Sequence, residues 1–539
     1  MPRFVGCWRW PPTYSNLAAG SSFSARPGSG RYTRVSFKEY DDHDALGLAA
    51  LVKKGEVSPA ELLEEAITRA ERVNPRLNAI VIGMNVLARE RARGELPEGP
   101  FRGVPFLMKD MGTAYAGVPL QAASRLYRGN VPSRHAELTE RFLRAGLVVF
   151  GKTNSPEFGI LPTTEPELYG PTHNPWRLGY SPGGSSGGAA ASVAAGIVPM
   201  AHGGDGGGSL RIPASCCGLF GFKPTRARNP VGPDVSETFF GFAAEHVLTR
   251  TVRDSAAALD ATAGPESTAM YHAPAPYGGF LEALGAPPEK LKIAFTVEPF
   301  LSGGEAHPDN RRAVEEAAKL LEDLGHHVEP ARPAFEARDF AKGFFLHFSA
   351  VVASELRAAE SFLGRPARRE DVELVTWLLG LVGRSTDAGT FVYYRRKLFE
   401  VQRAVAGFFQ DYDVLLTPTI GRPPVPHGTL VAKGLEEGVQ ELVARLDRPE
   451  LLRLPGLLDK AVDRAYAFSP YTPLFNVTGQ PSASVPLHWN RDGLPIGTML
   501  TARFGEDARL FRLCAQIEEA RSFRARRAPV HASASPGLS

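Results

Sequence analysis

Short apolar runs alternate with amphipathic segments along the chain. Residues 104–108 and 147–150 are apolar runs bounded by Gly, Pro or charged residues, a pattern typical of buried strands. Residues 137–145 and 310–324 place apolar side chains at helical spacing. Residues 58–61 read Ser-Pro-Ala-Glu, which supplies a capping serine, a proline at the first helical position and a glutamate three residues after the cap. Strands that alternate with helices predict an α/β fold.

The stretch from residue 180 to residue 224 departs from this pattern because it is crowded with glycines. It contains Gly-Gly-Ser-Ser-Gly-Gly at 183–188 and Gly-Gly-Asp-Gly-Gly-Gly-Ser at 203–209. Between them, the small residues of 189–201 predict a tightly packed helix. So many glycines cost backbone entropy, and we expect them where the backbone adopts positive φ or approaches a ligand. The stretch is therefore a candidate functional site.

Composition narrows the class of protein. The 539 residues include 61 Lys plus Arg and 58 Asp plus Glu, and 43% of them are hydrophobic, as in an ordinary globular protein. This charge balance disfavours binding of nucleic acid or of a membrane surface by the whole chain. No apolar run approaches the roughly 20 residues that a membrane-spanning helix needs. Four scattered cysteines, none in a Cys-x-x-Cys motif, indicate a reducing compartment, and we expect the cytoplasm.

The first 38 residues differ from the rest of the chain. They carry six basic residues, no acidic residue and many Ser, Gly and Pro. This composition predicts a disordered leader, while the same Arg-rich and Ser-rich character is also typical of an organellar targeting segment. Both interpretations place the folded body after this segment.

Two motifs in the body suggest rival functions. Residues 146–153 match the phosphate-binding pattern G-x-x-x-x-G-K-[ST], but their Leu-Val-Val-Phe centre is typical of a strand, and Pro156 opposes immediate entry into a helix, so a P-loop NTPase is disfavoured. Residues 183–187 match the G-x-S-x-G pattern of a Ser-His-Asp hydrolase, for which His427 or His488 could supply the base. No apolar strand leads into this motif, as such a nucleophile elbow requires.

Lys109 is a candidate base of another kind. It ends the apolar run at 104–108, so burial is expected to lower its pKa, and a lysine tuned in this way can act as a general base. The alternative is an ion pair with the adjacent Asp110. Asp205 and Arg211 flank Ser209 and are expected to form an ion pair that fixes the glycine-rich loop.

Taken together, these residues resemble the amidase signature family. The resemblance rests on 183–188, on Gly-Ser-Leu-Arg-Ile-Pro-Ala-Ser at 208–215, on Gly-Phe-Lys-Pro-Thr at 221–225 and on the upstream Lys109-Asp110, and it extends from about residue 45 to about residue 520. It implies one α/β domain over 39–527, in which a mixed, twisted central sheet is covered by helices on both faces. The signature core would span about 100–230 and the substrate-pocket half about 290–520, followed by a tail at 528–539.

The resemblance also implies a mechanism. Ser209 is the expected nucleophile, Ser185 the bridging serine after a cis peptide bond, and Lys109 the base; Ser185 is preferred over Ser186 because the family's bridging serine is the first of the pair. The oxyanion would be bound by the backbone N–H groups of Gly206, Gly207, Gly208 and Ser209, with Asp205, Arg211 and Ser186 in support. Most members carry a larger residue than Gly206 at its position, so a looser oxyanion hole is expected here. No metal or cofactor is required.

The resemblance leaves the substrate less defined than the reaction. Residues 163–166, 173–176 and 486–489 resemble those of the 6-aminohexanoate cyclic dimer hydrolases, which act on nylon oligomers. We therefore expect hydrolysis of a carbon–nitrogen bond in a small linear or cyclic amide, through an acyl-enzyme. The alternative is the glutamine amidase subunit of a tRNA-dependent amidotransferase, which Ile212 disfavours because such subunits typically carry Gln there. The expected partner is a small amide, with neither nucleic acid nor membrane, and a homodimer is compatible with the sequence.

Overall fold

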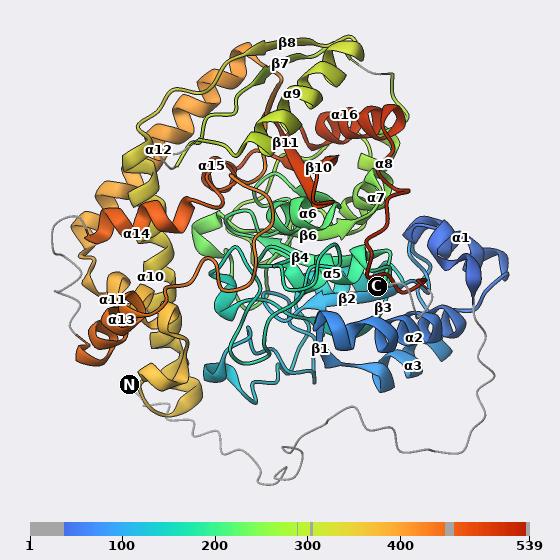
Figure 1. Ribbon diagram of the computed structural model, residues 1–539. Helices are drawn as coiled ribbons and strands as arrows, with labels where there is room; N and C mark the ends of the chain where they lie inside the picture. The colour runs from blue at the N-terminus through green and yellow to red at the C-terminus, as the bar shows by residue number, and fades with distance from the viewer. Residues whose placement is uncertain (1–36, 288, 302–304, 448–456, 535–539) are drawn as a thin grey trace, which may run out of the picture. The chain divides into compact units, whose positions relative to one another are not determined.

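One mixed β-sheet carries the fold (Figure 1). The computed structural model describes residues 37–287, 289–301, 305–447 and 457–534, so residues 1–36 of the predicted leader lie outside the described residues. The sheet has 11 strands in the order β1-β3-β2-β4-β6-β5-β10-β11-β9-β7-β8. The strands are β1 Ile80–Gly83, β2 Pro105–Lys109, β3 Val148–Thr153, β4 Met200–Asp205, β5 Phe220–Lys223, β6 Ala244–Thr249, β7 Lys292–Phe295, β8 His327–Pro330, β9 Val414–Pro418, β10 Ser482–Trp489 and β11 Pro495–Ala502.

Helices connect and cover these strands, as the α/β prediction required. The α-helices of the described residues are α1 Ala45–Lys54, α2 Pro59–Leu77, α3 Asn85–Arg93, α4 Glu137–Arg144, α5 Gly187–Ala194, α6 Arg211–Cys217, α7 Val252–Thr262, α8 Phe280–Ala283, α9 Pro308–Asp323, α10 Ala337–Leu363, α11 Leu374–Ser385, α12 Ala388–Asp411, α13 Leu435–Leu446, α14 Leu457–Tyr466, α15 Pro473–Thr478 and α16 Asp507–Ala520. The predicted cap of α2 is confirmed: the Ser58 side chain accepts from the Glu61 N–H, and the Glu61 carboxylate accepts from the Ser58 N–H.

Parallel and antiparallel pairing meet in the middle of the sheet. Strand β2 pairs parallel with β3 and β4, whereas β4 pairs antiparallel with β6, and β6 with β5. The carboxyl ends of β2 and β4 therefore lie at the same edge of the sheet, which brings Lys109 and the loop after Asp205 together.

The small-residue run at 189–201 is divided between a helix and a strand, whereas the sequence predicted one helix. Helix α5 ends at Ala194, Gly196 has a φ of +69°, and Met200 opens β4. The helical part is tightly packed as expected, because a Cβ at Gly188 would lie 2.5 Å from the backbone nitrogen of Asn154. The left-handed conformation of Gly196 ends the helix before the predicted boundary.

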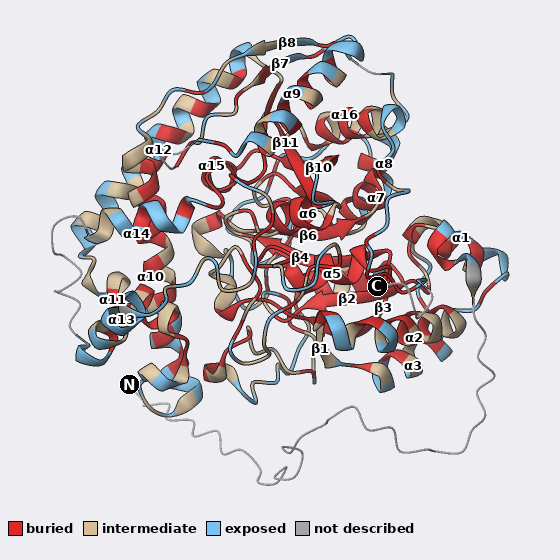
Figure 2. Ribbon diagram, in the orientation of Figure 1, coloured by how far each residue is buried: buried red, intermediate tan, exposed pale blue. Residues whose placement is uncertain are grey.

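The central strands of the sheet are buried, and exposed residues lie mainly on the outer helices (Figure 2). One core cluster gathers around α2, α5 and β2–β4, a second around α10–α12, and a third around α9, α16 and β9–β11. Part of the predicted tail packs on this body: the Val530 N–H donates to the Pro175 carbonyl, and the Ala532 N–H to the Ala195 carbonyl. The division into a signature core and a pocket half remains a prediction.

A search of the described helices found none with both the length and the apolar character needed to span a bilayer.

Candidate active site

Lys109 and Ser185 meet at the carboxyl end of β2. Lys109 is the last residue of the strand, and Ser185 lies just before the first turn of α5. The Lys109 Nζ donates to the Ser185 Oγ over 2.7 Å, and both residues are 1% exposed. The peptide bond between Gly184 and Ser185 is cis, as predicted. The first serine of the pair is therefore the one in contact with the lysine.

Burial changes the basicity of Lys109. It lowers the pKa of Lys109 to about 8, against the opposing effect of Glu245 and Asp205, whose negative charges raise it. The alternative pairing with Asp110 is not formed, because the Asp110 carboxylate accepts from the Gln121 N–H and the Tyr169 hydroxyl. A lysine with this pKa is partly neutral near pH 8 and can accept a proton.

Ser186 is engaged differently from Ser185. Its hydroxyl donates to the Gly204 carbonyl over 3.2 Å, and its backbone N–H donates to the Ser209 carbonyl over 3.3 Å. Ser186 thus ties α5 to the glycine-rich loop. The Ser209 side chain is partly exposed, and among the described residues it makes no hydrogen bond.

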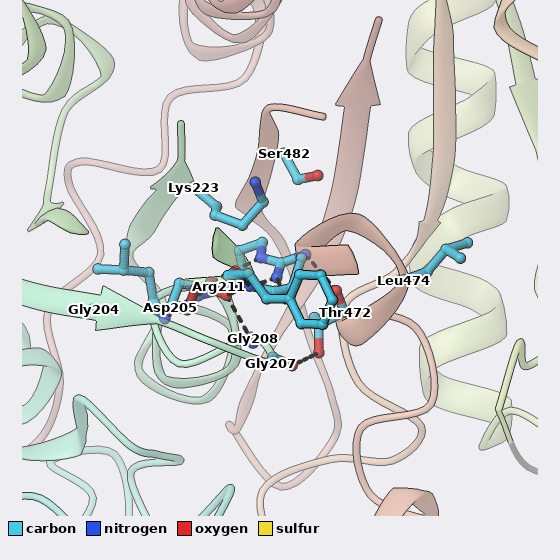
Figure 3. Close-up of polar contacts among 12 residues, drawn as sticks. Gly204, Asp205, Gly207, Gly208, Arg211, Lys223, Thr472, Leu474 and Ser482 are labelled. Atoms are coloured by element: carbon cyan, nitrogen blue, oxygen red, sulfur yellow. Dashed lines mark hydrogen bonds and ion pairs between the residues drawn. The ribbon is translucent and has the colours of Figure 1, made fainter. Parts of the chain in front are cut away.

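The glycine-rich loop is fixed by the predicted ion pair of Asp205 and Arg211. The Arg211 Nη2 and Nε lie 2.8 and 2.9 Å from the two Asp205 carboxylate oxygens, and both side chains are 0% exposed. Burial alone would raise the pKa of Asp205, but Arg211 and Asn476 outweigh it and lower that pKa to about 2. Figure 3 shows Asp205 and Arg211 side by side, with Lys223 near them.

Asn476 and Thr472 complete the support of this loop. The Asn476 amide nitrogen donates to the Asp205 carbonyl and carboxylate over 2.7 and 2.9 Å. The Thr472 hydroxyl donates to the Gly207 carbonyl over 2.6 Å (Figure 3). No role was assigned to Asn476 or Thr472 from the sequence. Their polar side chains beside Pro473 gave no signal of a contact with a loop more than 260 positions earlier.

The backbone N–H groups of the loop are not equivalent. The Gly208 N–H donates to the Asp205 carboxylate over 2.8 Å, so it is already occupied. Within the described part of the chain, the N–H groups of Gly206, Gly207 and Ser209 donate to no carbonyl or side chain. Three of the four predicted oxyanion donors are therefore unengaged.

Aromatic rings border the loop on one side. A Cβ at Gly206 would lie 3.4 Å from the Phe239 ring, and one at Gly207 would lie 3.6 Å from the Phe344 ring. Phe344 comes from α10, in the region where the sequence predicted the substrate pocket, whereas Phe239 comes from the loop before β6. The two ring centroids are 5.4 Å apart. They give the side of the site next to the glycines an apolar wall.

The rival interpretations do not fit this structure. Residues Val148–Thr153 form a buried strand instead of a phosphate-binding loop, which excludes the P-loop interpretation of that motif. His427 contacts His173 and Glu165, and His488 contacts Glu316. Within the described chain, neither histidine forms a hydrogen bond with Ser185 or Ser209.

The chain matches one protein family and is similar to known enzymes. A family model described as Amidase matches residues 61–511. The 6-aminohexanoate-cyclic-dimer hydrolase of Paenarthrobacter ureafaciens is 35% identical over 497 residues, which cover 90% of this chain and 96% of that protein. The putative amidase AmiC of Mycobacterium tuberculosis is 36% identical over 496 residues, with coverages of 90% and 96%.

Solved structures that are similar to this chain include the same kinds of enzyme. A 6-aminohexanoate cyclic dimer hydrolase complexed with substrate is similar to this chain with a TM-score of 0.82 and 34% identity, covering 90% of this chain and 99% of that one. A bacterial aryl acylamidase of the amidase signature family has a TM-score of 0.77 and 27% identity, covering 90% and 98%.

Proposed function

The chain belongs to the amidase family and is a hydrolase of carbon–nitrogen bonds other than peptide bonds, and we propose that it cleaves a small, uncharged linear or cyclic amide through an acyl-enzyme on Ser209. The observation that carries the proposal is the 2.7 Å hydrogen bond from the buried Lys109 ammonium to the Ser185 hydroxyl. It supports a proton path that starts at a lysine whose pKa is about 8.

Acylation begins with proton transfer along the serines. Neutral Lys109 takes a proton from Ser185, Ser185 takes one from Ser209, and the Ser209 oxygen attacks the amide carbonyl carbon. The carbon–nitrogen bond then breaks, and the departing nitrogen receives the proton that returns from Lys109 through Ser185. With a linear amide the free amine leaves, whereas with a cyclic amide it stays at the far end of the opened acyl chain, and in both cases the acyl group remains as an ester on Ser209.

The oxyanion is bound by backbone N–H groups. We assign this role to Gly206, Gly207 and Ser209, and we remove Gly208 from the predicted set because its N–H donates to Asp205. Gly208, Asp205, Arg211 and Asn476 fix the loop so that the other three donors stay oriented. Ser186 supports the same loop through its backbone N–H.

Deacylation reuses the same groups. A water molecule attacks the ester carbonyl while its proton passes through Ser185 to Lys109, and Ser209 recovers its proton as it leaves. The products are the carboxylic acid and the regenerated enzyme. Apart from this water, each step uses side-chain and backbone groups of this chain.

The substrate proposal rests on the relatives and on the apolar wall. Two relatives at 35% identity are 6-aminohexanoate-cyclic-dimer hydrolases, and Phe239 and Phe344 border the glycine loop with uncharged surface. An aliphatic cyclic dimer of this kind fits such a wall. We place the enzyme in the cytoplasm, which is supported by the three free, buried cysteines of the described residues.

A substrate panel tests the proposal. The purified full chain is given cyclic and linear 6-aminohexanoate dimers, aryl anilides, fatty amides and glutamine, with Ser209→Ala as the blank. We expect hydrolysis of an uncharged aliphatic amide that is lost in Ser209→Ala. Activity confined to glutamine would instead support the amidotransferase subunit.

A further inference from the structure

A buried histidine–glutamate pair lies behind the backbone of Lys109. His202 on β4 is 0% exposed and Glu245 on the adjacent strand β6 is 8% exposed. The Lys109 backbone N–H donates to the His202 Nδ1 over 3.3 Å, and the His202 Nε2 lies 3.0 Å from the Glu245 Oε2. The pair thus connects the lysine-bearing strand to β6 across the centre of the sheet.

The hydrogen bonds define which atom donates in this pair. A backbone N–H can only donate, so the His202 Nδ1 must accept and carries no proton in this contact. The proton of a neutral imidazole is then on Nε2, which donates to the Glu245 carboxylate. The Glu245 carboxylate thus accepts from His202, and its negative charge acts on Lys109. Within the described chain, His202 is the only side chain that hydrogen-bonds this carboxylate.

Two glycines make room for the carboxylate. A Cβ at Gly204 would lie 2.6 Å from the Glu245 Oε2, and one at Gly112 would lie 3.0 Å from its Oε1. Gly204 belongs to the glycine-rich stretch, whose density the sequence could attribute only to backbone flexibility or ligand approach. Gly112 follows Lys109 by three positions and has a φ of +84°. Both glycines allow an acid to approach strands β2 and β4 closely.

We propose that Glu245, oriented by His202, is a positioning residue that provides Lys109 with a fixed buried counter-anion; this rests on the proposed role of Lys109 as base. During acylation Lys109 passes through its ammonium form in a site that excludes water, and a nearby anion stabilises that form. Without Glu245, the ammonium would be more costly and the lysine a weaker base.

Other charged groups near Lys109 have partners of their own. Asp205 on β4 is paired with Arg211, and Asp110 accepts from Gln121 and Tyr169. Lys152 on β3 interacts electrostatically with Asp110. Helix α5 carries no charged residue. Among the described residues, Asp205 is therefore offset by Arg211 and Asp110 by Lys152, whereas Glu245 forms no ion pair with a lysine or an arginine.

The test is the pH dependence of kcat/KM for Glu245→Gln in the full chain, with the amide that the substrate panel identifies. A glutamine keeps an oxygen that accepts from the His202 Nε2, so the local contact is retained while the charge is removed. The pKa of Lys109 should fall, and the acidic limb of the profile should move to lower pH by about one unit. Glu245→Asp, which keeps the charge, should restore much of the wild-type profile.

Glu316→Gln is the matched control. Glu316 also pairs with a histidine, His488, over 3.0 Å, but it lies on α9 and makes no contact with Lys109. The acidic limb of the kcat/KM profile of Glu316→Gln should coincide with that of the wild type. If the acidic limb of Glu245→Gln stays at the pH of the wild-type limb while Lys109→Met is inactive, the role of Glu245 is wrong. The proposed function is not affected by that result. A Lys109→Met variant that still forms the acyl-enzyme would overturn the proposed function.

Discussion

The Lys109 ammonium donates to the Ser185 hydroxyl over 2.7 Å although the two residues are 76 positions apart in the chain. They meet because β2 ends beside the start of α5, and both residues are almost fully buried. Water is thus kept from the contact, and the serine that follows, Ser186, faces a different partner.

Ser185→Ala and Ser186→Ala should separate a catalytic hydroxyl from a supporting one. Removing the Ser185 hydroxyl interrupts the proton path, and we expect kcat to fall about 10²-fold to 10⁴-fold. Removing the Ser186 hydroxyl costs one neutral hydrogen bond to the Gly204 carbonyl, about 1 kcal/mol of stability. Steady-state kinetics and thermal unfolding of both variants check this. Equal losses of kcat would contradict the assignment.

The activity of the wild-type enzyme should rise with pH through an acidic limb near 8. Burial lowers the pKa of Lys109 to about 8; below it the ammonium dominates and cannot accept a proton, and above it the neutral amine can. The profile of kcat/KM against pH measures this limb. Lys109→Met should abolish it together with nearly all activity. A limb near 6.5 that persists in this variant would point to a histidine.

The Asp205–Arg211 pair should matter more to stability than any other single contact of the site. Asp205→Asn leaves a buried guanidinium without its anion, and we expect the free energy of unfolding to fall by about 3–5 kcal/mol. Urea unfolding measures it. A loss below about 1 kcal/mol would mean that the loop does not depend on the pair.

The same pair gives stability a defined pH dependence. The pKa of Asp205 is about 2 in the folded chain, below its ordinary value of 3.8. Its contribution to stability is therefore complete above 3.8 and is lost as the pH falls towards 2. As the pH falls from 3.8 towards 2, the free energy of unfolding should therefore fall less in Asp205→Asn than in the wild type.

Gly206 and Gly208 should respond differently to alanine. A Cβ at Gly208 would lie 2.3 Å from the Thr472 Oγ1, and its φ of +129° disfavours any side chain, so Gly208→Ala should lose both stability and activity. A Cβ at Gly206 meets only ordinary contacts with Phe239 and Ala243, so Gly206→Ala should keep its melting temperature. Comparing the two melting curves checks this. A large fall in the melting temperature of Gly206→Ala would show that the loop is as constrained at Gly206 as at Gly208.

The sequence was sufficient for contacts that depend on local spacing or on a known motif. The Ser58–Glu61 cap, the Asp205–Arg211 pair and the lysine–serine contact all belong to this class. The predicted helix over 189–201 ended early because Gly196, the one glycine of this run, turns the chain, and the run was interpreted by the small size of its residues without treating Gly196 as a helix end.

Contacts that depend on sheet order were beyond the sequence. Glu245 reaches the region of Lys109 only because β6 pairs with β4, and β4 with β2. Asn476 and Asp205 are 271 positions apart, and they meet only because α15 packs against the glycine-rich loop. Their residue types were visible, but strand order and helix placement decide which polar groups meet. The contact of the Gly208 N–H with the Asp205 carboxylate could not be predicted either, and it is the reason why we leave Gly208 out of the proposed oxyanion hole.

Trapping the acyl-enzyme tests the central claim most directly. The full chain is mixed with its amide substrate, quenched in acid within the first turnover, digested and mapped by mass spectrometry. The account predicts one added acyl group on Ser209 in the wild type and none in Ser209→Ala. An acyl group on Ser185 or Ser186, or complete turnover by Ser209→Ala, would contradict it.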